Sequence, residues 1–170
     1  MNRIKKNNIA QSLYSFTPVI LLFISVLNEI DFNYSGLKYF SFNFAYILIF
    51  YYNLKKSEGL GFGLVFIAGL LNDVVIGMPI GLSSLIYLLL CGAASYLRNI
   101  TLRPNLMKDC IFFLMTILTL NSLSFLILTF IFSYELNYLD QVINIIFTFT
   151  FYLIFSYFFN LLEKFIRERS

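Results

Sequence analysis

Six apolar runs, most of them bounded by charged residues, constrain this chain more than any other feature of its sequence. The first run, residues 9–28, is uncharged over 20 residues, about the length that a helix needs to cross ~30 Å of hydrocarbon. Only 12% of the residues are charged, against about 25% in soluble domains, and the mean hydropathy is +0.81. We therefore predict an all-α integral membrane protein with a single polytopic domain over residues 1–170. Its six predicted transmembrane helices are residues 9–28, 39–54, 59–77, 80–97, 110–133 and 141–162.

The basic residues predict on which side of the membrane each loop lies. All lysines and arginines except Lys38 fall near the two ends of the chain or in the loops after the second and fourth spans. Loops rich in lysine and arginine stay cytoplasmic, so both termini are predicted to be cytoplasmic. Tyr51 and Tyr52, beside Lys55, are predicted to belong to an aromatic belt at the membrane interface.

A short motif surrounds Asp73, the only charged residue inside a predicted span. Gly69, Asp73 and Gly77 are four residues apart and share one face of a helix, on which the G-x-x-x-G pair of Gly59 and Gly63 lies further back. An unpaired carboxylate facing lipid costs at least ~2.5 kcal/mol, whereas small residues let another helix approach closely. We therefore predict that this face points into the bundle.

Glycine and proline predict a tight turn between the third and fourth spans. Gly77 and Gly81 give the backbone the conformational freedom that a turn needs. Pro79 suits the first turn of the next helix, because the N–H that proline lacks would have no partner there. In the fourth span, Gly81 and Ser84 belong to a face of mostly small residues. The third and fourth spans are therefore predicted to pack closely against each other.

Two interpretations of Asp73 are open from the sequence. In one, Asp73 binds a proton, a cation or a polar ligand in a cavity between helices, with neighbours drawn from Asn72, Ser83, Ser84 and Asn121. In the other, its carboxylate accepts hydrogen bonds from the turn and from the start of the fourth span. The second interpretation, or a partner-binding role, is favoured because no second acid or buried base is present to relay protons. If Asp73 binds a proton or a cation, the Asp73→Asn variant should lose function. If its carboxylate only anchors the turn by hydrogen bonds, the variant should largely keep it.

Several chemistries are disfavoured by the composition. The chain contains no histidine, and Cys91 and Cys110 lack C-x-x-C spacing, so we expect no metal site and no cofactor. The absence of histidine also removes the commonest general base, so we expect no enzyme. The net charge of +3 is scattered at the ends of apolar runs, which favours the lipid bilayer and not nucleic acid as the surface that the chain contacts.

The segments Gly61–Gly63, Gly69–Asp73 and Gly77–Leu82 resemble the motif of the MreD family of rod shape-determining proteins. Length and span count resemble that family too, although Ser83 and Ser84 stand where small residues or histidine are common. The resemblance implies a non-catalytic scaffold in the bacterial inner membrane, within the cell-elongation machinery that supports cell shape and peptidoglycan synthesis. The partners that it implies are MreC and, beside it, the actin-like MreB, RodA and a class B penicillin-binding protein.

The resemblance transfers a pattern and no catalytic residue. The predicted partner-binding or structural residues are Gly59, Gly63, Gly69, Asn72, Asp73, Gly77, Pro79, Gly81 and Ser84. The helical layout also resembles the substrate-binding subunits of energy-coupling-factor vitamin transporters. The alternative function is therefore a subunit of a membrane transporter that binds a small, vitamin-like molecule, oriented by Asp73.

Overall fold

The computed structural model describes residues 17–27, 42–55, 60–101, 105–134 and 137–169, and this part of the chain forms helices and no strand. The first helix, Thr17–Leu27, is apolar and lies within the first predicted span. The helices that follow are α2 (Phe44–Lys55), α3 (Phe62–Ile76), α4 (Leu82–Ile100), α5 (Leu106–Phe130) and α6 (Tyr138–Arg169). The all-α class predicted from the sequence is confirmed.

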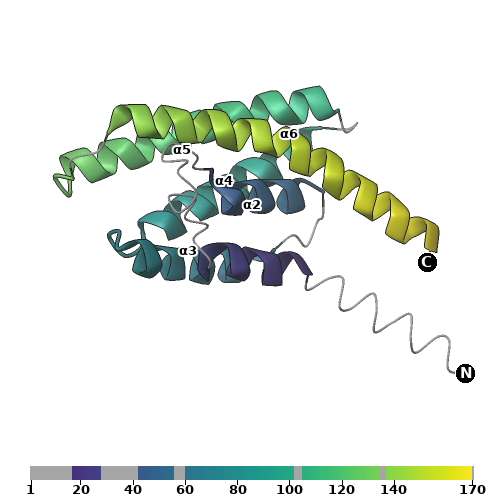
Figure 1. The fold of residues 1–170 in the computed structure, drawn as a ribbon, viewed down its shortest axis with the longest axis horizontal. Coiled ribbons are helices and arrows are strands. Elements are labelled where there is room, and N and C mark those ends of the chain that lie inside the picture. Colours follow the sequence, from purple (N-terminus) through teal and green to yellow (C-terminus); the bar gives the residue numbers. More distant parts are fainter. Residues whose placement is uncertain (1–16, 28–41, 56–59, 102–104, 135–136, 170) are drawn as a thin grey trace, which may run out of the picture.

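The helices are stacked in three layers (Figure 1). Helices α5 and α6 run side by side along one face, α2 and α4 form the middle, and α3 lies with the N-terminal helix along the opposite face. Helix α4 contacts α2, α3 and α5, and α2 also contacts α6. Helices α3 and α4 form a hairpin, and α4 joins this hairpin to α2 and α5.

Helix α2 is the centre of the bundle. All residues from Ala45 to Leu54 are buried, so the helix is enclosed on every side, as expected of a helix that is apolar all round. Its 12 residues give a length of about 18 Å, shorter than the ~30 Å of a hydrocarbon core. The helix begins five residues after the predicted start of the span, because Asn43 caps it: Asn43 Oδ1 accepts a hydrogen bond from Tyr46 N at 3.3 Å. The backbone N–H of Asn43 donates to Thr148 Oγ1 of α6 at 2.9 Å.

An aromatic cluster joins α2 to α5 and α6. The ring centroids of Phe50 and Phe113 are 4.9 Å apart, and Phe113 stacks on Tyr152 with centroids 4.0 Å apart. Aromatic pairs of this kind contribute about 0.5–1.5 kcal/mol beyond the area that they bury. The cluster therefore stabilises the contact between the middle layer and the α5–α6 layer.

The prediction that Tyr51 and Tyr52 form an interfacial belt is wrong. Both side chains are buried, and Tyr51 Oη donates a hydrogen bond to Asn160 Oδ1 of α6 at 3.1 Å. The rings also contact Phe159, at centroid distances of 5.1 and 5.7 Å. Because neighbouring helices enclose α2, none of its faces is left for the interface.

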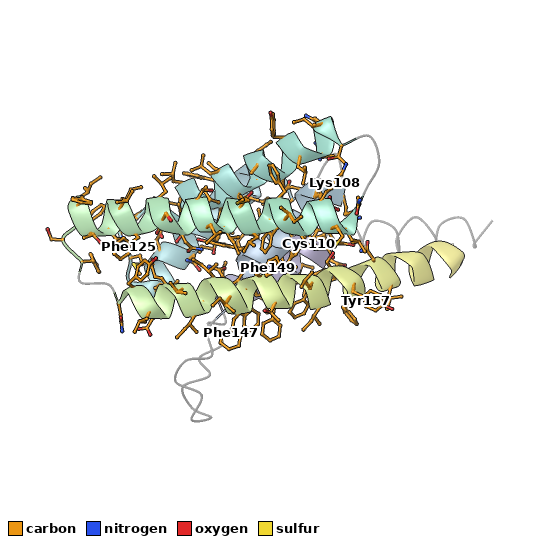
Figure 2. The ribbon with its side chains drawn as sticks, turned by 90° about the horizontal axis from the view of Figure 1, so that it is seen from above. Lys108, Cys110, Phe125, Phe147, Phe149 and Tyr157 are labelled. Atoms are coloured by element: carbon orange, nitrogen blue, oxygen red, sulfur yellow. The ribbon has the colours of Figure 1, made fainter. Side chains whose placement is uncertain are left out.

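Two helices are long and apolar enough to cross a membrane, Leu106–Phe130 and the segment Tyr138–Leu161 of α6, whereas Thr17–Leu27 and Phe62–Ile76 are apolar but shorter. Most residues of the two long helices are not buried, and Figure 2 shows side chains such as Tyr157, which is 65% exposed, pointing away from the bundle. Such a large apolar surface is unusual in water and expected against lipid. The six-span topology stays a prediction.

Candidate functional site

The connection between α3 and α4 brings the two ends of these helices together. Helix α3 is followed by Gly77 in the left-handed conformation (φ 73°), and its N–H donates to Asp73 O. Gly81, also left-handed (φ 100°), directly precedes α4. Glycine reaches this conformation without a steric penalty, which explains both positions. Pro79 was predicted to lie in the first turn of the next helix, but it lies in the connection. Helix α4 begins only at Leu82, whose N–H donates to Pro79 O.

The carboxylate of Asp73 lies at the N-terminus of α4. Its Oδ2 accepts a hydrogen bond from Gly81 N at 2.7 Å, and its Oδ1 accepts one from Ser83 N at 2.9 Å. The first N–H groups of a helix have no partner within the helix and carry the positive end of its dipole, so a carboxylate is favourable there. Asp73 is fully buried. An acid in one helix therefore caps the next helix, which is the geometry that the hydrogen-bonding interpretation requires.

Two further hydrogen bonds connect α3 to α4. Asn72 Nδ2 donates to Ser83 Oγ at 3.0 Å, one residue away from the Asp73 contacts. Ser84 Oγ donates to Phe66 O at 3.0 Å, two turns further down the hairpin. Interhelical hydrogen bonds of this kind are worth about 0.6 kcal/mol each in membrane proteins. Together they fix the register of α3 on α4.

Gly69 is the point of closest approach between the two helices. A Cβ atom on Gly69 would lie closer than 3.0 Å to three backbone atoms, Cα and N of Ser84 and C of Ser83. Only a residue without a side chain fits here, as in the close helix contacts that small residues permit in membranes. Gly69, Asn72, Asp73 and Ser84 thus form one contact between α3 and α4, together with Ser83.

Other predicted residues lie elsewhere. Gly63 is exposed, and a Cβ atom there would meet nothing within 4 Å in the described chain. The prediction that it belongs to the inward face is wrong, because Gly63 precedes Gly69 by six residues, which places it about 120° away around a helix with 3.6 residues per turn. Gly59 lies outside the described residues. Asn121, considered as a neighbour of Asp73, donates instead to Ile117 O within α5 at 3.0 Å.

A second buried acid, Asp109, was missed from the sequence. The predicted fifth span begins at residue 110 and leaves Asp109 just outside it, but Asp109 lies in the first turn of α5 and is only 3% exposed. Helix α5 begins earlier than predicted because Asn105 Oδ1 caps it, accepting a hydrogen bond from Met107 N at 3.1 Å. The signal was present in the sequence, since an asparagine followed by an acid in the first turn is typical of a helix start.

Arg98 places a positive charge at the C-terminus of α2. It lies in the last turn of α4, and its Nη1 donates to the carbonyl oxygen of Asn53, near the C-terminus of α2, at 2.8 Å. A cation is favourable at a helix C-terminus, as an anion is at an N-terminus. Helix α4 is therefore tied to α3 by Asp73 at its start and to α2 by Arg98 at its end.

A cavity lies in another part of the bundle. It is a groove of about 530 Å³ between α5 and α6, and none of the residues of the Asp73 motif lines it. Asp73 is fully buried, and each carboxylate oxygen already accepts a backbone hydrogen bond. The arrangement therefore offers no support for a ligand bound at Asp73, in a transporter subunit or otherwise.

Long apolar helices and a buried, internally hydrogen-bonded polar motif define the class: a helical membrane protein whose motif residues pack helices together. The family model described as rod shape-determining protein MreD matches residues 10–166, so the chain belongs to the MreD family. The resemblance inferred from the motif is confirmed. Membership indicates a role in rod shape determination, in a membrane protein family that is not known for catalysis. No curated protein and no solved structure matches the chain significantly.

Proposed function

We propose that this protein is a non-catalytic scaffold of the bacterial cell-elongation complex in the inner, cytoplasmic membrane. It supports cell shape and peptidoglycan synthesis by binding an MreC-like protein and, through it, MreB, RodA and a class B penicillin-binding protein. The match to the MreD family over residues 10–166 carries the proposal. The hydrogen bonds of Asp73, Asn72 and Ser84 within the hairpin support it, because they give these side chains a packing role.

The hairpin presents an exposed face suited to a partner helix. Gly63, Ile67 and Val74 follow one side of α3 at helical spacing; Gly63 is exposed, and Ile67 and Val74 are 47% and 66% exposed. In a bilayer, helices associate through close packing and small residues, because lipid and apolar side chains are equally apolar. We assign these three residues, the outer stripe of α3, as the contact for the single transmembrane helix of an MreC-like protein.

Depletion of the protein is expected to make rod-shaped cells round up. The MreC-like protein of the same cell should copurify with the tagged chain, and the Gly63→Leu variant should capture it at least about fivefold less well, because leucine keeps the partner helix at a distance. Gly92→Leu is the matched control: Gly92 is an exposed glycine of α4 with equally open surroundings. Cells that keep their shape would contradict the function, and equal capture by the wild type and Gly63→Leu would contradict the outer stripe.

The proposed topology places both termini in the cytoplasm and the α5–α6 connection outside. It rests on the lysines and arginines, all of which except Lys38 lie beside the cytoplasmic ends of the proposed spans, whereas the acids Glu135 and Asp140 lie beside the outer connection. A fluorescent protein fused after Ser170 should fold and emit, and a phosphatase that works only outside the membrane should be inactive at the same position. An active phosphatase there would reverse the topology.

A further inference from the structure

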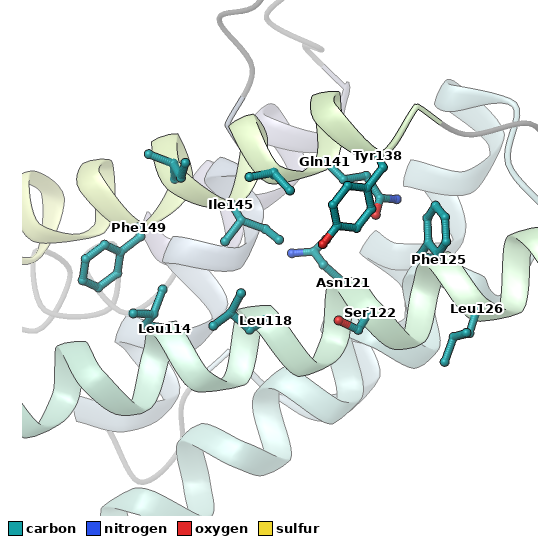
Figure 3. Close-up of a pocket in the computed structure, with 12 residues that line it drawn as sticks. Leu114, Leu118, Asn121, Ser122, Phe125, Leu126, Tyr138, Gln141, Ile145 and Phe149 are labelled. Atoms are coloured by element: carbon teal, nitrogen blue, oxygen red, sulfur yellow. The ribbon is translucent and has the colours of Figure 1, made fainter.

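The groove between α5 and α6 follows the two helices over several turns (Figure 3). At one end the rings of Phe125 and Tyr138 are 6.1 Å apart, which sets the antiparallel register of the two helices. At the other end the groove is lined by Leu114 of α5 and Phe149 of α6. The walls consist of residues that recur every three or four positions on each helix, as one continuous helix face requires. The groove is therefore an elongated channel along the hairpin and not a round pocket.

The lining changes from polar to apolar along the groove. Asn121, Ser122 and Gln141 lie towards the α5–α6 connection, near the hydroxyl of Tyr138, and the Asn121, Tyr138 and Gln141 side chains lie close together in Figure 3. Leu118 lies among the apolar residues on the other side of them. Asn121 uses one of its two amide hydrogens on Ile117 O, which leaves the other for a bound molecule. The end of the groove near the connection thus carries the hydrogen-bonding groups, beside the apolar side chains of Phe125 and Leu126, and the other end is wholly apolar.

The size of the groove limits what can occupy it. The groove has a volume of about 530 Å³. A volume of about 300–1,000 Å³ is typical of sites for small molecules. A single hydrocarbon chain packs with carbon contacts of about 4 Å and fits an elongated channel. The volume and the elongated shape of the groove therefore match a lipid chain.

We propose that the groove binds one acyl chain of a membrane glycerophospholipid. The chain lies against Leu118 and Ile145, and the ester carbonyls accept hydrogen bonds from the amides of Asn121 and Gln141. The polar end lies towards the α5–α6 connection, where both membrane-length helices reach the bilayer surface and where the esters of a lipid lie. None of the twelve described lining residues is charged, so the site does not distinguish anionic from zwitterionic headgroups.

Native mass spectrometry of the full chain, extracted in mild detergent from vesicles of phosphatidylethanolamine and phosphatidylglycerol, tests the proposal. Leu118→Trp fills the groove and should reduce the fraction of protein that carries one bound phospholipid about tenfold. Leu123→Trp is the control, because Leu123 has a similar exposure on the same helix (36% against 41%) but does not line the groove. Ile145→Trp on the facing wall should repeat the loss, with Ile154→Trp as its control, in case one variant fails to fold.

Loss of the bound phospholipid in both groove variants, with retention in both controls and no preference between the two headgroups, supports the site. Equal retention in all variants, or equal loss in groove and control variants, overturns it. A strong preference for phosphatidylglycerol also overturns it, because an uncharged lining cannot select an anion. If Leu118→Trp abolishes capture of the MreC-like protein while bound lipid is unchanged, the groove is a protein contact and the lipid proposal is wrong.

Discussion

Replacing Gly69 by alanine is expected to separate α3 from α4 and to destabilise the whole bundle. The new Cβ atom would lie closer than 3.0 Å to backbone atoms of Ser83 and Ser84, which cannot move aside as a flexible side chain can. Overpacking of this kind costs about 1–3 kcal/mol, and displacement of the helices also weakens the bonds of Ser84 to Phe66 and of Asp73 to Ser83. We expect an apparent Tm in detergent lowered by about 5–10 °C.

Gly63→Ala is the matched control for this variant. Both glycines lie in α3, but a Cβ atom on Gly63 meets nothing within 4 Å, and alanine favours a helix over glycine by about 1 kcal/mol. The control should therefore leave the Tm unchanged or raise it slightly. An equal loss in both variants would show that the close contact at Gly69 does not cause the effect, since helix propensity acts in the opposite direction, and would remove the assigned role of Gly69.

Removing the carboxylate of Asp73 is expected to destabilise the bundle at least as much as Gly69→Ala does. Asp73→Ala leaves the N–H groups of Gly81 and Ser83 without their acceptor at the start of α4. Hydrogen bonds to a charged group are worth about 1.5–3 kcal/mol each, so the loss should be about 3 kcal/mol or more. Thermal unfolding in detergent measures the change, and shape complementation in depleted cells should fail with it.

Asp73→Asn should lie between the wild type and Asp73→Ala. The two N–H groups are bonded to different oxygens, and an asparagine offers one oxygen and one NH₂ group, so one of the two bonds is lost. The sequence alone suggested that this variant would largely survive; the geometry predicts a partial loss. Ser83→Ala is the control, since it removes only the weaker contact to Asn72 and keeps the backbone N–H. A wild-type Tm in Asp73→Ala would contradict the capping role.

The part of the site that depends on helical spacing could be predicted from the sequence. Gly69 and Asp73 were placed together on a face that packs against α4, because residues four apart on a helix share a face whatever surrounds them. The N–H groups that Asp73 would bond could not be named, since they depend on the path of the turn. The error at Gly63 has a different origin, because six residues separate it from Gly69 and six residues are not close to a whole number of helical turns.

The burial of α2 could not be predicted for a different reason. Lipid is as apolar as leucine, so a helix enclosed by protein and a helix facing lipid have the same apolar composition. Tyr51 and Tyr52 beside lysine therefore suggested an interface, and only the surrounding helices show that they are enclosed. Asp109 was misplaced because a charged residue next to an apolar run was taken as the end of the loop rather than as part of the helix start.

The enclosed position of α2 implies an order of assembly for the bundle during synthesis. Two of the bonds that hold α2, Asn43 N to Thr148 Oγ1 and Tyr51 Oη to Asn160 Oδ1, join residues 105 and 109 positions apart. They form only after α6 has left the ribosome. Until then α2 lacks these contacts, so its enclosed position in the bundle is completed only after α6 has been synthesised.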